Sequence, residues 1–244
     1  MRKLCMILGF GLFTVSFAQE PPSKKEDLHV YLLIGQSNMA GRAPFTEEES
    51  KPIKGVFLLN GEAQWEPASN PLNRYSTIRK GLGMQRMNPG YQFALEMSKQ
   101  GQAIGLVVNA RGGISIEQWA VDTKFYREAI RRAREAQKTG TLKGVLWHQG
   151  ESNHGDPQRY AQKLAVLVER LRLDLGDAKL PFVAGQIVNP SPINDEIAKL
   201  PGEVNHTAFA SSEGLKTYDR WHFDAPSTKQ LGKRYADAMK KLLK

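Results

Sequence analysis

One serine, one aspartate and one histidine in this sequence have the residue types and surroundings that nucleophilic catalysis needs. Ser37 follows a short apolar segment and a glycine, a placement that can expose a hydroxyl where a strand ends. A serine becomes a nucleophile when a base takes its proton, and the base needs a third group to fix its tautomer. Asp219 and His222 are three residues apart, so on one helical turn the carboxylate reaches Nδ1 and leaves Nε2 free for Ser37. The three residues predict an acyl-transfer site.

Acyl transfer also requires hydrogen-bond donors for the oxyanion of the tetrahedral intermediate, each worth about 3 kcal/mol. The sequence offers the backbone N–H of Ser37, a backbone N–H in the Gly112–Gly113 turn and the side-chain amide of Gln149. These donors must surround one point to act together. We therefore expect the fold to bring the three segments to one place.

A metal-dependent hydrolase is an alternative on the residues alone. His148, Glu151 and His154 are spaced by three, which on a helix would gather them on one side as metal ligands. Gly150 and Gly155 disfavour a continuous helix in this segment. The residues therefore favour the serine mechanism over this one.

A non-catalytic carbohydrate-binding protein is a second alternative, because aromatic faces suit the apolar faces of sugars. The available tryptophans are Trp65, Trp119, Trp147 and Trp221. We expect Trp147 to pack in the core, because it lies inside a predicted strand. Trp221 lies between the candidate acid and base, which makes it a candidate wall of the substrate pocket. The complete set of catalytic residue types argues against a protein that only binds.

The elements that must position these residues follow from hydrophobic patterning. Short apolar segments predict buried strands at 28–34, 56–59, 103–109, 143–148, 182–188 and 206–211. Further patterns predict helices at 89–100, 123–138, 157–175 and 225–244. Buried strands that alternate with helices favour an α/β fold with a parallel sheet covered on both faces. Ligands of such sheets lie beyond the carboxyl ends of the strands, where the polar segments 35–38, 109–113, 149–153 and 219–222 would converge.

The amino-terminal residues have the pattern of a secretory signal peptide. Arg2 and Lys3 precede an apolar segment, and small residues before Gln19 suit cleavage, so we expect residues 1–18 to be removed. Residues 19–27 are polar and predict a flexible lead-in, and 28–244 predict a single domain. The mature chain would lose its one cysteine, Cys5, and therefore have no disulfide and no cysteine nucleophile. We expect a secreted or periplasmic protein without a membrane span.

Composition and charge narrow the partners. The chain is 41% hydrophobic and 24% charged, which excludes a disordered chain, and its net charge of +9 falls to +7 without the signal peptide. Such a charge raises the question of an anionic partner. In the helix predicted at 123–138, four arginines alternate with Glu128 and Glu135, which predicts a solvated face; they are Arg127, Arg131, Arg132 and Arg134. We therefore expect no nucleic-acid partner.

Four motifs resemble a known family. They are GQSNMAGR at 35–42, NARGGISIEQW at 109–119, WHQGESN at 147–153 and DRWHFDAPSTKQLGKRYA at 219–236. Together they resemble the sialate O-acetylesterase-type branch of the SGNH hydrolases, which includes the acetylxylan esterases of carbohydrate esterase family six. The resemblance spans nearly the whole mature chain. It implies a three-layer α/β/α fold with a central parallel sheet, and removal of acetyl groups from sugar hydroxyls without a metal or other cofactor.

Carried over to this sequence, the resemblance makes Ser37 the nucleophile, His222 the base and later the acid, and Gly113 the second oxyanion donor. Gln149 stands where many SGNH enzymes have an asparagine. The G-x-S-x-G elbow of α/β-hydrolases is absent, because Met39 occupies the second glycine position.

The orienting acid has two candidates under the same resemblance. Asp219 matches the D-x-x-H pattern and is favoured, whereas in some members of this branch the glutamate of HQGE, here Glu151, takes the role. Glu151 could instead pair with Arg111 and fix two loops against each other.

The substrate contacts are the least defined part of the site. Asn38, Arg111 and Trp221 are candidates, although Asn38 also suits a role in stabilising the turn around the nucleophile. We expect specificity to reside in residues 43–88 and in a loop at 189–195. Acetylated xylan, an acetylated pectin or host glycan, and O-acetyl sialic acid all fit as acetylated oligo- or polysaccharide substrates.

Overall fold

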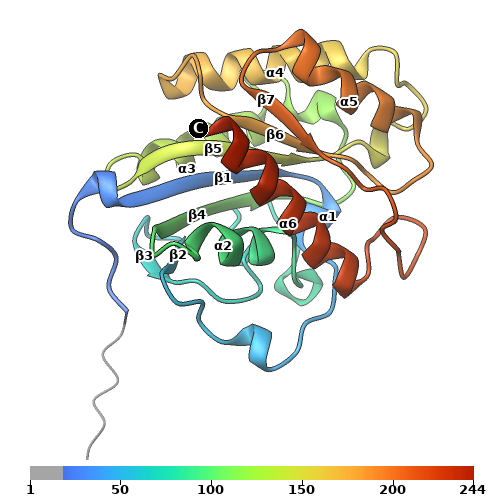
Figure 1. Cartoon of the computed structure of the whole chain (residues 1–244). Helices are drawn as coiled ribbons and strands as arrows, with labels where there is room; N and C mark the ends of the chain where they lie inside the picture. The colour runs from blue at the N-terminus through green and yellow to red at the C-terminus, as the bar shows by residue number, and fades with distance from the viewer. Residues whose placement is uncertain (1–18) are drawn as a thin grey trace, which may run out of the picture.

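A seven-stranded sheet forms the centre of the protein in a computed structural model that describes residues 19–244 (Figure 1). The predicted signal peptide lies outside the described residues. The strands are β1 (Leu28–Gly35), β2 (Val56–Leu59), β3 (Trp65–Pro67), β4 (Ala103–Ala110), β5 (Thr141–His148), β6 (Phe182–Gly185) and β7 (Thr207–Ala210), in the spatial order β3-β2-β4-β1-β5-β6-β7. All neighbouring strands are parallel except β3, a short strand that sequence patterning missed and that pairs antiparallel with β2. The predicted α/β fold with a central parallel sheet is confirmed.

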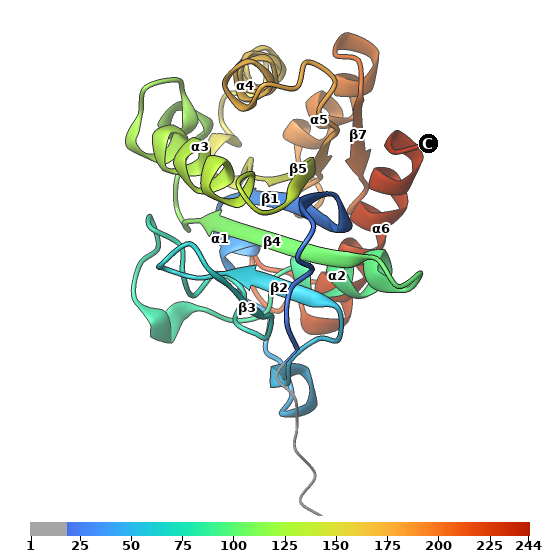
Figure 2. The same ribbon diagram turned by 90° about the vertical axis from the view of Figure 1, so that its left-hand side faces the viewer.

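Helices cover both faces of the sheet and complete three layers (Figure 2). On one face lie α3 (Lys124–Ala136), α4 (Tyr160–Leu175) and α5 (Pro192–Glu203), and on the other lie α2 (Gly90–Ser98) and α6 (Ala225–Leu242). The single turn α1 (Ser37–Ala40) follows β1, and short 3₁₀ turns occur at Lys25–Asp27, Glu48–Ser50, Leu82–Met84, Ile116–Trp119 and Glu151–Asn153. No helix in this part of the chain is long and apolar enough to cross a membrane.

The alternation of side chains along β1 divides the core into two halves. Val30, Leu32 and Ile34 pack toward α3, α4 and α5, whereas Tyr31 and Leu33 pack toward α2 and α6. Because every one of these side chains is fully buried, each contributes on the order of 2 kcal/mol to stability. The side chains on both faces of the central strands are therefore packed in the core. Functional residues are expected only where the strands end.

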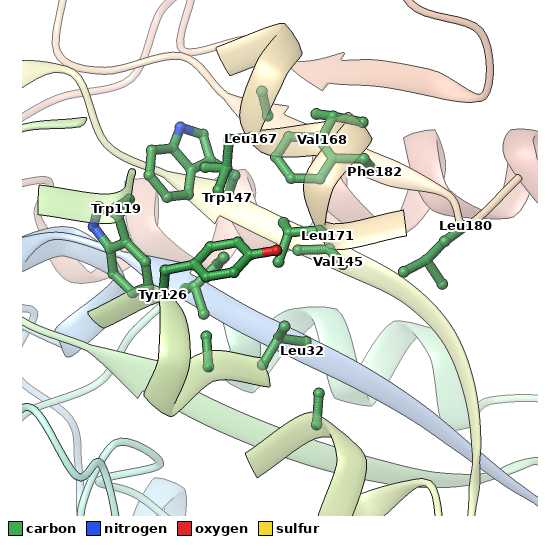
Figure 3. Close-up of a cluster of buried hydrophobic side chains, with 14 of the residues drawn as sticks. Leu32, Trp119, Tyr126, Val145, Trp147, Leu167, Val168, Leu171, Leu180 and Phe182 are labelled. Carbon is green, nitrogen blue, oxygen red and sulfur yellow. The ribbon is translucent and has the colours of Figure 1, made fainter. Parts of the chain in front are cut away.

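The tryptophans divide between core and surface. Trp119 and Trp147 are fully buried against the α3–α4 layer, with their rings edge to face and 5.5 Å apart (Figure 3). The prediction that Trp147 packs in the core is confirmed. Trp65 is half-buried and donates a hydrogen bond of 2.8 Å from Nε1 to Thr139 Oγ1, just before β5 begins. Trp221 is the tryptophan that is exposed, in the segment between β7 and α6.

Two expectations about the elements are wrong. Residues 189–195 are not simply a loop, because α5 begins at Pro192, and the strand predicted at 182–188 ends at Gly185. The sequence did contain a helix signal here: the Ser191 hydroxyl accepts the N–H of Ile193, and proline occupies the first helical position.

Arg132 corrects the prediction of a solvated face on α3. Its side chain is 2% exposed and donates hydrogen bonds of 2.6 Å to the carbonyl of Leu59 and 2.5 Å to that of Asn60. These carbonyls lie at and just beyond the carboxyl end of β2, so the guanidinium caps the end of that strand. Burial lowers the pKa of Arg132 to about 10. Arg127, Arg131 and Arg134 are exposed, as predicted.

Candidate active site

The carboxyl ends of the three central strands lie at one level. Gly35, the last residue of β1, pairs with Ala110 of β4 on one side and with His148 of β5 on the other. The residues that follow each strand therefore meet at one edge of the sheet. This register confirms the expected convergence of the first three polar segments.

Gly35 makes the sharp turn that presents the serine. Its φ of +137° belongs to the region that favours glycine, and a Cβ atom here would lie 2.1 Å from the carbonyl oxygen of His148. That same carbonyl accepts the N–H of Gln36 at 2.8 Å. The chain therefore crosses the end of β5 with no room for a side chain, and Ser37 begins α1 immediately afterwards.

Gly112 approaches Ser37 more closely than Gly113 does. A Cβ atom on Gly112 would lie 3.2 Å from Cβ of Ser37, whereas one on Gly113, which is exposed at φ +72°, would lie 3.9 Å from Nζ of Lys80. Within residues 19–244, the backbone N–H groups of Ser37, Gly112 and Gly113 donate to no protein acceptor. All three remain free for an oxyanion, and Gly112 joins the predicted Gly113 as a candidate donor.

Gln149 does not fit the predicted role of oxyanion donor. Its side chain is fully buried, and its Nε2 donates to Gln36 Oε1 at 3.0 Å, to the carbonyl of Ile114 at 3.2 Å and to Asn153 Oδ1 at 2.7 Å. With the amide hydrogens engaged, none is left for a substrate. Gln149 instead ties the three loops behind the site to one another.

His222 and Asp219 are in contact, although not on a helix. Asp219 Oδ2 lies 2.7 Å from His222 Nδ1, while Oδ1 accepts the backbone N–H groups of Trp221 and His222, each at 2.7 Å. The segment is therefore a bend closed by the aspartate, which precedes α6, and the expected helical turn is wrong. Partial burial alone would raise the pKa of Asp219, but the hydrogen bonds from His222 and the two N–H groups outweigh it and lower that pKa.

Asn38 joins the serine turn to the histidine bend. Its Nδ2 donates to the carbonyl of Trp221 at 3.0 Å, and its Oδ1 accepts the N–H of Phe223 at 3.3 Å, so it holds the residues on both sides of His222. Among the described residues no hydrogen bond connects the Ser37 hydroxyl with the imidazole, a contact that often tightens only when substrate binds. Asn38 is 4% exposed with all its polar atoms engaged, which corrects its candidacy as a substrate contact.

Glu151 contacts Asn38 and neither of the partners expected for it. Its Oε1 accepts Asn38 Nδ2 at 2.7 Å and lies 3.7 Å from Nε2 of His148. No hydrogen bond or ion pair joins Glu151 to His222 or Arg111 within residues 19–244. The Arg111 guanidinium lies 5.6 Å from the centre of the Phe125 ring instead, so the proposed Glu151–Arg111 pair is wrong.

The alternative metal ligands do not converge. His148 is fully buried with Nδ1 3.1 Å from the hydroxyl of Tyr235, whereas His154 is exposed with Nδ1 3.2 Å from Ser191 Oγ. In the part of the chain that the structure describes, no three His, Cys, Asp or Glu side chains are grouped to hold a metal ion. The segment Glu151–Asn153 is a single 3₁₀ turn, so the helix this alternative needed is missing.

Sequence comparison identifies the family. The family described as "Carbohydrate esterase, sialic acid-specific acetylesterase" matches residues 27–241. The chain belongs to this family. It is therefore a carboxylic ester hydrolase, and the carbohydrate acetylesterase activity that the motifs implied is supported at this level.

Known relatives agree with this placement of the esterase. It is 29% identical over 235 residues to a probable carbohydrate esterase of Arabidopsis thaliana, with 86% of this chain and 89% of that one covered. A solved structure of an Arabidopsis thaliana protein matches with a TM-score of 0.79 at 27% identity, over 91% of this chain and 99% of that one. A carbohydrate acetylesterase from Xanthomonas citri shares the fold, with a TM-score of 0.64 at 20% identity over 88% and 56% of the two chains.

A polar cavity of about 330 Å³ adjoins the histidine bend of the esterase. Glu151, Asn189, Ser191, Arg220 and Trp221 are among the residues that line it. Trp221 is 37% exposed, and its ring packs against the Arg220 guanidinium at 4.5 Å. The expectation that Trp221 forms a pocket wall agrees with this geometry, as does the placement of residues 189–191 beside the site.

Two buried asparagines that the sequence analysis missed hold the long segment 43–88 of the esterase in place. Asn73 accepts the N–H of Ala110 and donates to its carbonyl, both at 3.0 Å, and Asn88 donates to the carbonyl of Met39 at 2.8 Å. Both are fully buried. In the sequence, each of them is only an asparagine in a segment without hydrophobic periodicity. One sequence does not distinguish such an asparagine from an ordinary turn residue.

Arg42 and Lys80 are further residues of the esterase site that the sequence analysis missed. Arg42 Nη2 lies 2.7 Å from the point that a Cβ of Gly112 would occupy, which brings the guanidinium close to Ser37. Its Nη1 donates to the carbonyls of Gly41 and Met84. Neither cation forms an ion pair among the described residues. Burial lowers the pKa of Arg42, and the positive charge of the nearby Arg86 lowers it further. One side of the nucleophile is therefore positively charged.

Two tyrosines from opposite layers hold the end of β5. Tyr235 of α6 donates its hydroxyl hydrogen to the carbonyl of Trp147 at 2.6 Å. Tyr160 of α4 donates to the carbonyl of Gln149 at 2.6 Å and accepts Trp147 Nε1 at 3.0 Å. Both are fully buried, so the strand end behind the catalytic edge is fixed from above and below.

Proposed function

We propose that this esterase removes acetyl groups from sugar hydroxyls through an acetyl-serine intermediate, with Ser37 as nucleophile, His222 as general base and Asp219 as the orienting acid. The observation that carries the proposal is the 2.7 Å contact between Asp219 Oδ2 and His222 Nδ1, on a bend that Asn38 joins to the serine turn.

In the first step, His222 Nε2 takes the hydroxyl proton as Ser37 Oγ attacks the acetyl carbonyl. The oxyanion that forms accepts the backbone N–H of Ser37 and those of the Gly112–Gly113 turn. The sugar alcohol leaves with the proton from His222. Water then loses a proton to the same imidazole and hydrolyses the acetyl-serine, which releases acetate and restores the serine.

Asp219 is favoured over Glu151 as the orienting acid because its carboxylate contacts the imidazole of His222. By accepting Nδ1–H, Oδ2 keeps the lone pair on Nε2, the nitrogen that must take the serine proton. The lowered pKa of Asp219 keeps it ionised when the solution becomes mildly acidic. Glu151 makes its hydrogen bond to Asn38 instead.

The sugar is proposed to occupy the cavity beside Trp221, whose wall offers hydroxyl, amide and charged groups for sugar hydroxyls. Acetylated xylan, pectin and sialic acid remain the candidate substrates. The unpaired cations Arg42, close to the nucleophile, and Lys80, by the Gly113 turn, favour the acidic candidates, acetylated pectin and O-acetyl sialic acid, over a neutral xylan.

Acetate release from a panel of these three acetylated substrates tests the proposal, with p-nitrophenyl acetate as a substrate without sugar contacts. We expect Ser37→Ala to lose at least about 1000-fold in kcat/KM on every substrate. Unchanged hydrolysis by Ser37→Ala would remove the serine mechanism. Loss of activity in EDTA with recovery on adding zinc would favour the metal-dependent alternative.

Export is part of the proposal, because the pattern of residues 1–18 is that of a signal peptide. Amino-terminal sequencing of protein recovered outside the cytoplasm should begin at Gln19. Recovery of the chain only inside the cytoplasm with Met1 in place would contradict export.

A further inference from the structure

A chain of buried polar side chains leads from the core of the protein to the histidine bend. It runs from Tyr235 through His148 and Glu151 to Asn38, and each member is less than one-tenth exposed. We infer that Glu151 is a positioning residue of the esterase reaction, which acts on His222 through Asn38 and not by direct contact. This inference rests on the proposed function, because it takes His222 as the base.

The first link fixes the orientation of His148. The Tyr235 hydroxyl has one hydrogen, and it donates that hydrogen to the carbonyl of Trp147 at 2.6 Å. Its contact of 3.1 Å with His148 must therefore be a hydrogen bond that His148 Nδ1–H donates. The ring is held with Nε2 toward Glu151, 3.7 Å from Oε1. Glu151 Oε1, the oxygen that accepts from Asn38, thus has the His148 ring as a fixed neighbour.

The second link fixes which way the Asn38 amide faces. Nδ2 donates one hydrogen to Glu151 Oε1 and the other to the carbonyl of Trp221, while Oδ1 accepts the N–H of Phe223. If the amide turned over, its oxygen would face the carboxylate of Glu151 and the carbonyl of Trp221, and its NH₂ would face the N–H of Phe223. Glu151 therefore favours, together with the Trp221 carbonyl and the Phe223 N–H, the amide orientation that holds the backbone on both sides of His222.

The consequence for catalysis is geometric. Asp219 fixes the tautomer of His222, but the distance between Nε2 and Ser37 depends on where the bend sits. Asn38 is the residue next to Ser37 and also holds the bend, so it sets that distance directly. A misplacement of about 1 Å can cost about 100-fold in rate. Glu151 keeps the Asn38 side chain in the orientation that maintains this distance.

Reversal of the hydrogen bond between residues 38 and 151 tests the inference on p-nitrophenyl acetate. In Glu151→Gln the new carbonyl oxygen still accepts from Asn38, so we expect a loss of about threefold in kcat/KM. In Asn38→Asp two acceptors face each other at the former 2.7 Å contact, and we expect a loss of about 100-fold. Adding Glu151→Gln to Asn38→Asp restores a donor there and should recover about tenfold.

Glu96→Gln is the matched control. Glu96 is also a buried glutamate whose Oε1 accepts a side-chain amide, Nε2 of Gln92 at 3.0 Å, but both lie on α2 and neither belongs to the site described above. We expect it to keep wild-type activity. Thermal unfolding of every variant accompanies the kinetics, and recovery of activity in the double variant separates positioning from a general loss of stability.

Two results would overturn the inference. A loss in Glu151→Gln as large as that of Asp219→Asn, with the same change in the pH–activity profile, would make Glu151 the orienting acid. A double variant no more active than Asn38→Asp would show that residues 38 and 151 do not act through their shared hydrogen bond. Full activity of Ser37→Ala would instead contradict the proposed function itself, whatever the Glu151 variants do.

Discussion

On one side of Ser37, the polar side chains of Asn38, Glu151 and His148 are buried and contact one another. On the other side, Arg42 and Lys80 carry charges with no acidic partner in the part of the chain described. The hydrogen bonds of Asn38 fix the geometry on the first side, because moving Asn38 or Glu151 would leave a buried partner unpaired. Unpaired, accessible charges remain available for a ligand. The contrast assigns positioning to the first side and substrate contact to the second.

The largest effect is expected where the buried side meets the chemistry. Asp219→Asn should lower kcat/KM by about 1000- to 10,000-fold, because the amide can donate to Nδ1 and favour the wrong tautomer of His222. Initial rates on p-nitrophenyl acetate between pH 4 and pH 9 measure the loss and the pH–activity profile of the variant. An effect below tenfold would contradict the role of Asp219.

The adjacent glycines sharpen the comparison between the two sides. A Cβ in Gly112→Ala would meet Arg42 Nη2 at 2.7 Å and Ser37 Cβ at 3.2 Å, so we expect about a 100-fold loss in kcat. A Cβ in Gly113→Ala meets only Lys80 Nζ at 3.9 Å, but its φ of +72° is unfavourable for alanine. We expect the free energy of unfolding to fall by about 1 kcal/mol with a smaller kinetic effect. Equal kinetic losses in both variants would remove the distinction.

Lys80→Gln tests only the side of Ser37 that carries the unpaired cations Arg42 and Lys80. We expect KM to rise about three- to tenfold for an acidic acetylated sugar and to stay unchanged for p-nitrophenyl acetate, because an exposed charge attracts only a charged partner. Salt at 0.5 M should weaken the wild-type preference in the same way, since it screens exposed charges. An equal response of both substrates would contradict a substrate-facing role for this side.

The smallest effect concerns the stability of the folded protein at acid pH. It involves Glu117, which accepts hydrogen bonds from Asn153 and Lys163. Partial burial opposes ionisation of Glu117, but these donors and Ser115 outweigh it and lower its pKa to about 2. The folded pKa lies below that of the unfolded chain, so the stabilisation is present above about pH 4.5 and is lost as pH falls toward 2. In Glu117→Gln, thermal unfolding between pH 5 and pH 3 should depend less on pH. An unchanged slope would contradict this.

The sequence predicted the sheet and its catalytic edge because both depend on local patterns. Apolar segments such as 28–34 directly indicate buried strands. In a parallel sheet the carboxyl ends of the strands lie at the same edge, whatever the sequence of the loops. The Asp219–His222 contact was predicted for the same reason, since it needs only a spacing of three. Its helical setting was wrong because the aspartate closes a bend with its second oxygen.

What the sequence could not predict are partners distant along the chain. Gln149 was expected to donate to substrate, but Gln36, Ile114 and Asn153 take its amide hydrogens. Arg132 was expected in solvent, but it lies against two carbonyls at the end of β2, more than seventy residues earlier. One chain offers no signal for such pairings, because each depends on where two separate loops come to rest.

The end of β5 belongs to both helical layers, since Tyr160 and Tyr235 hold it from opposite faces. Neither layer can separate from the sheet without releasing a buried carbonyl behind Ser37. Opening of the catalytic edge is therefore tied to global unfolding, and the amide hydrogens at the end of β5 should exchange only when the whole domain opens. We therefore expect the catalytic edge to lie in the most cooperative part of the esterase fold, and the substrate-facing loops to lie outside it.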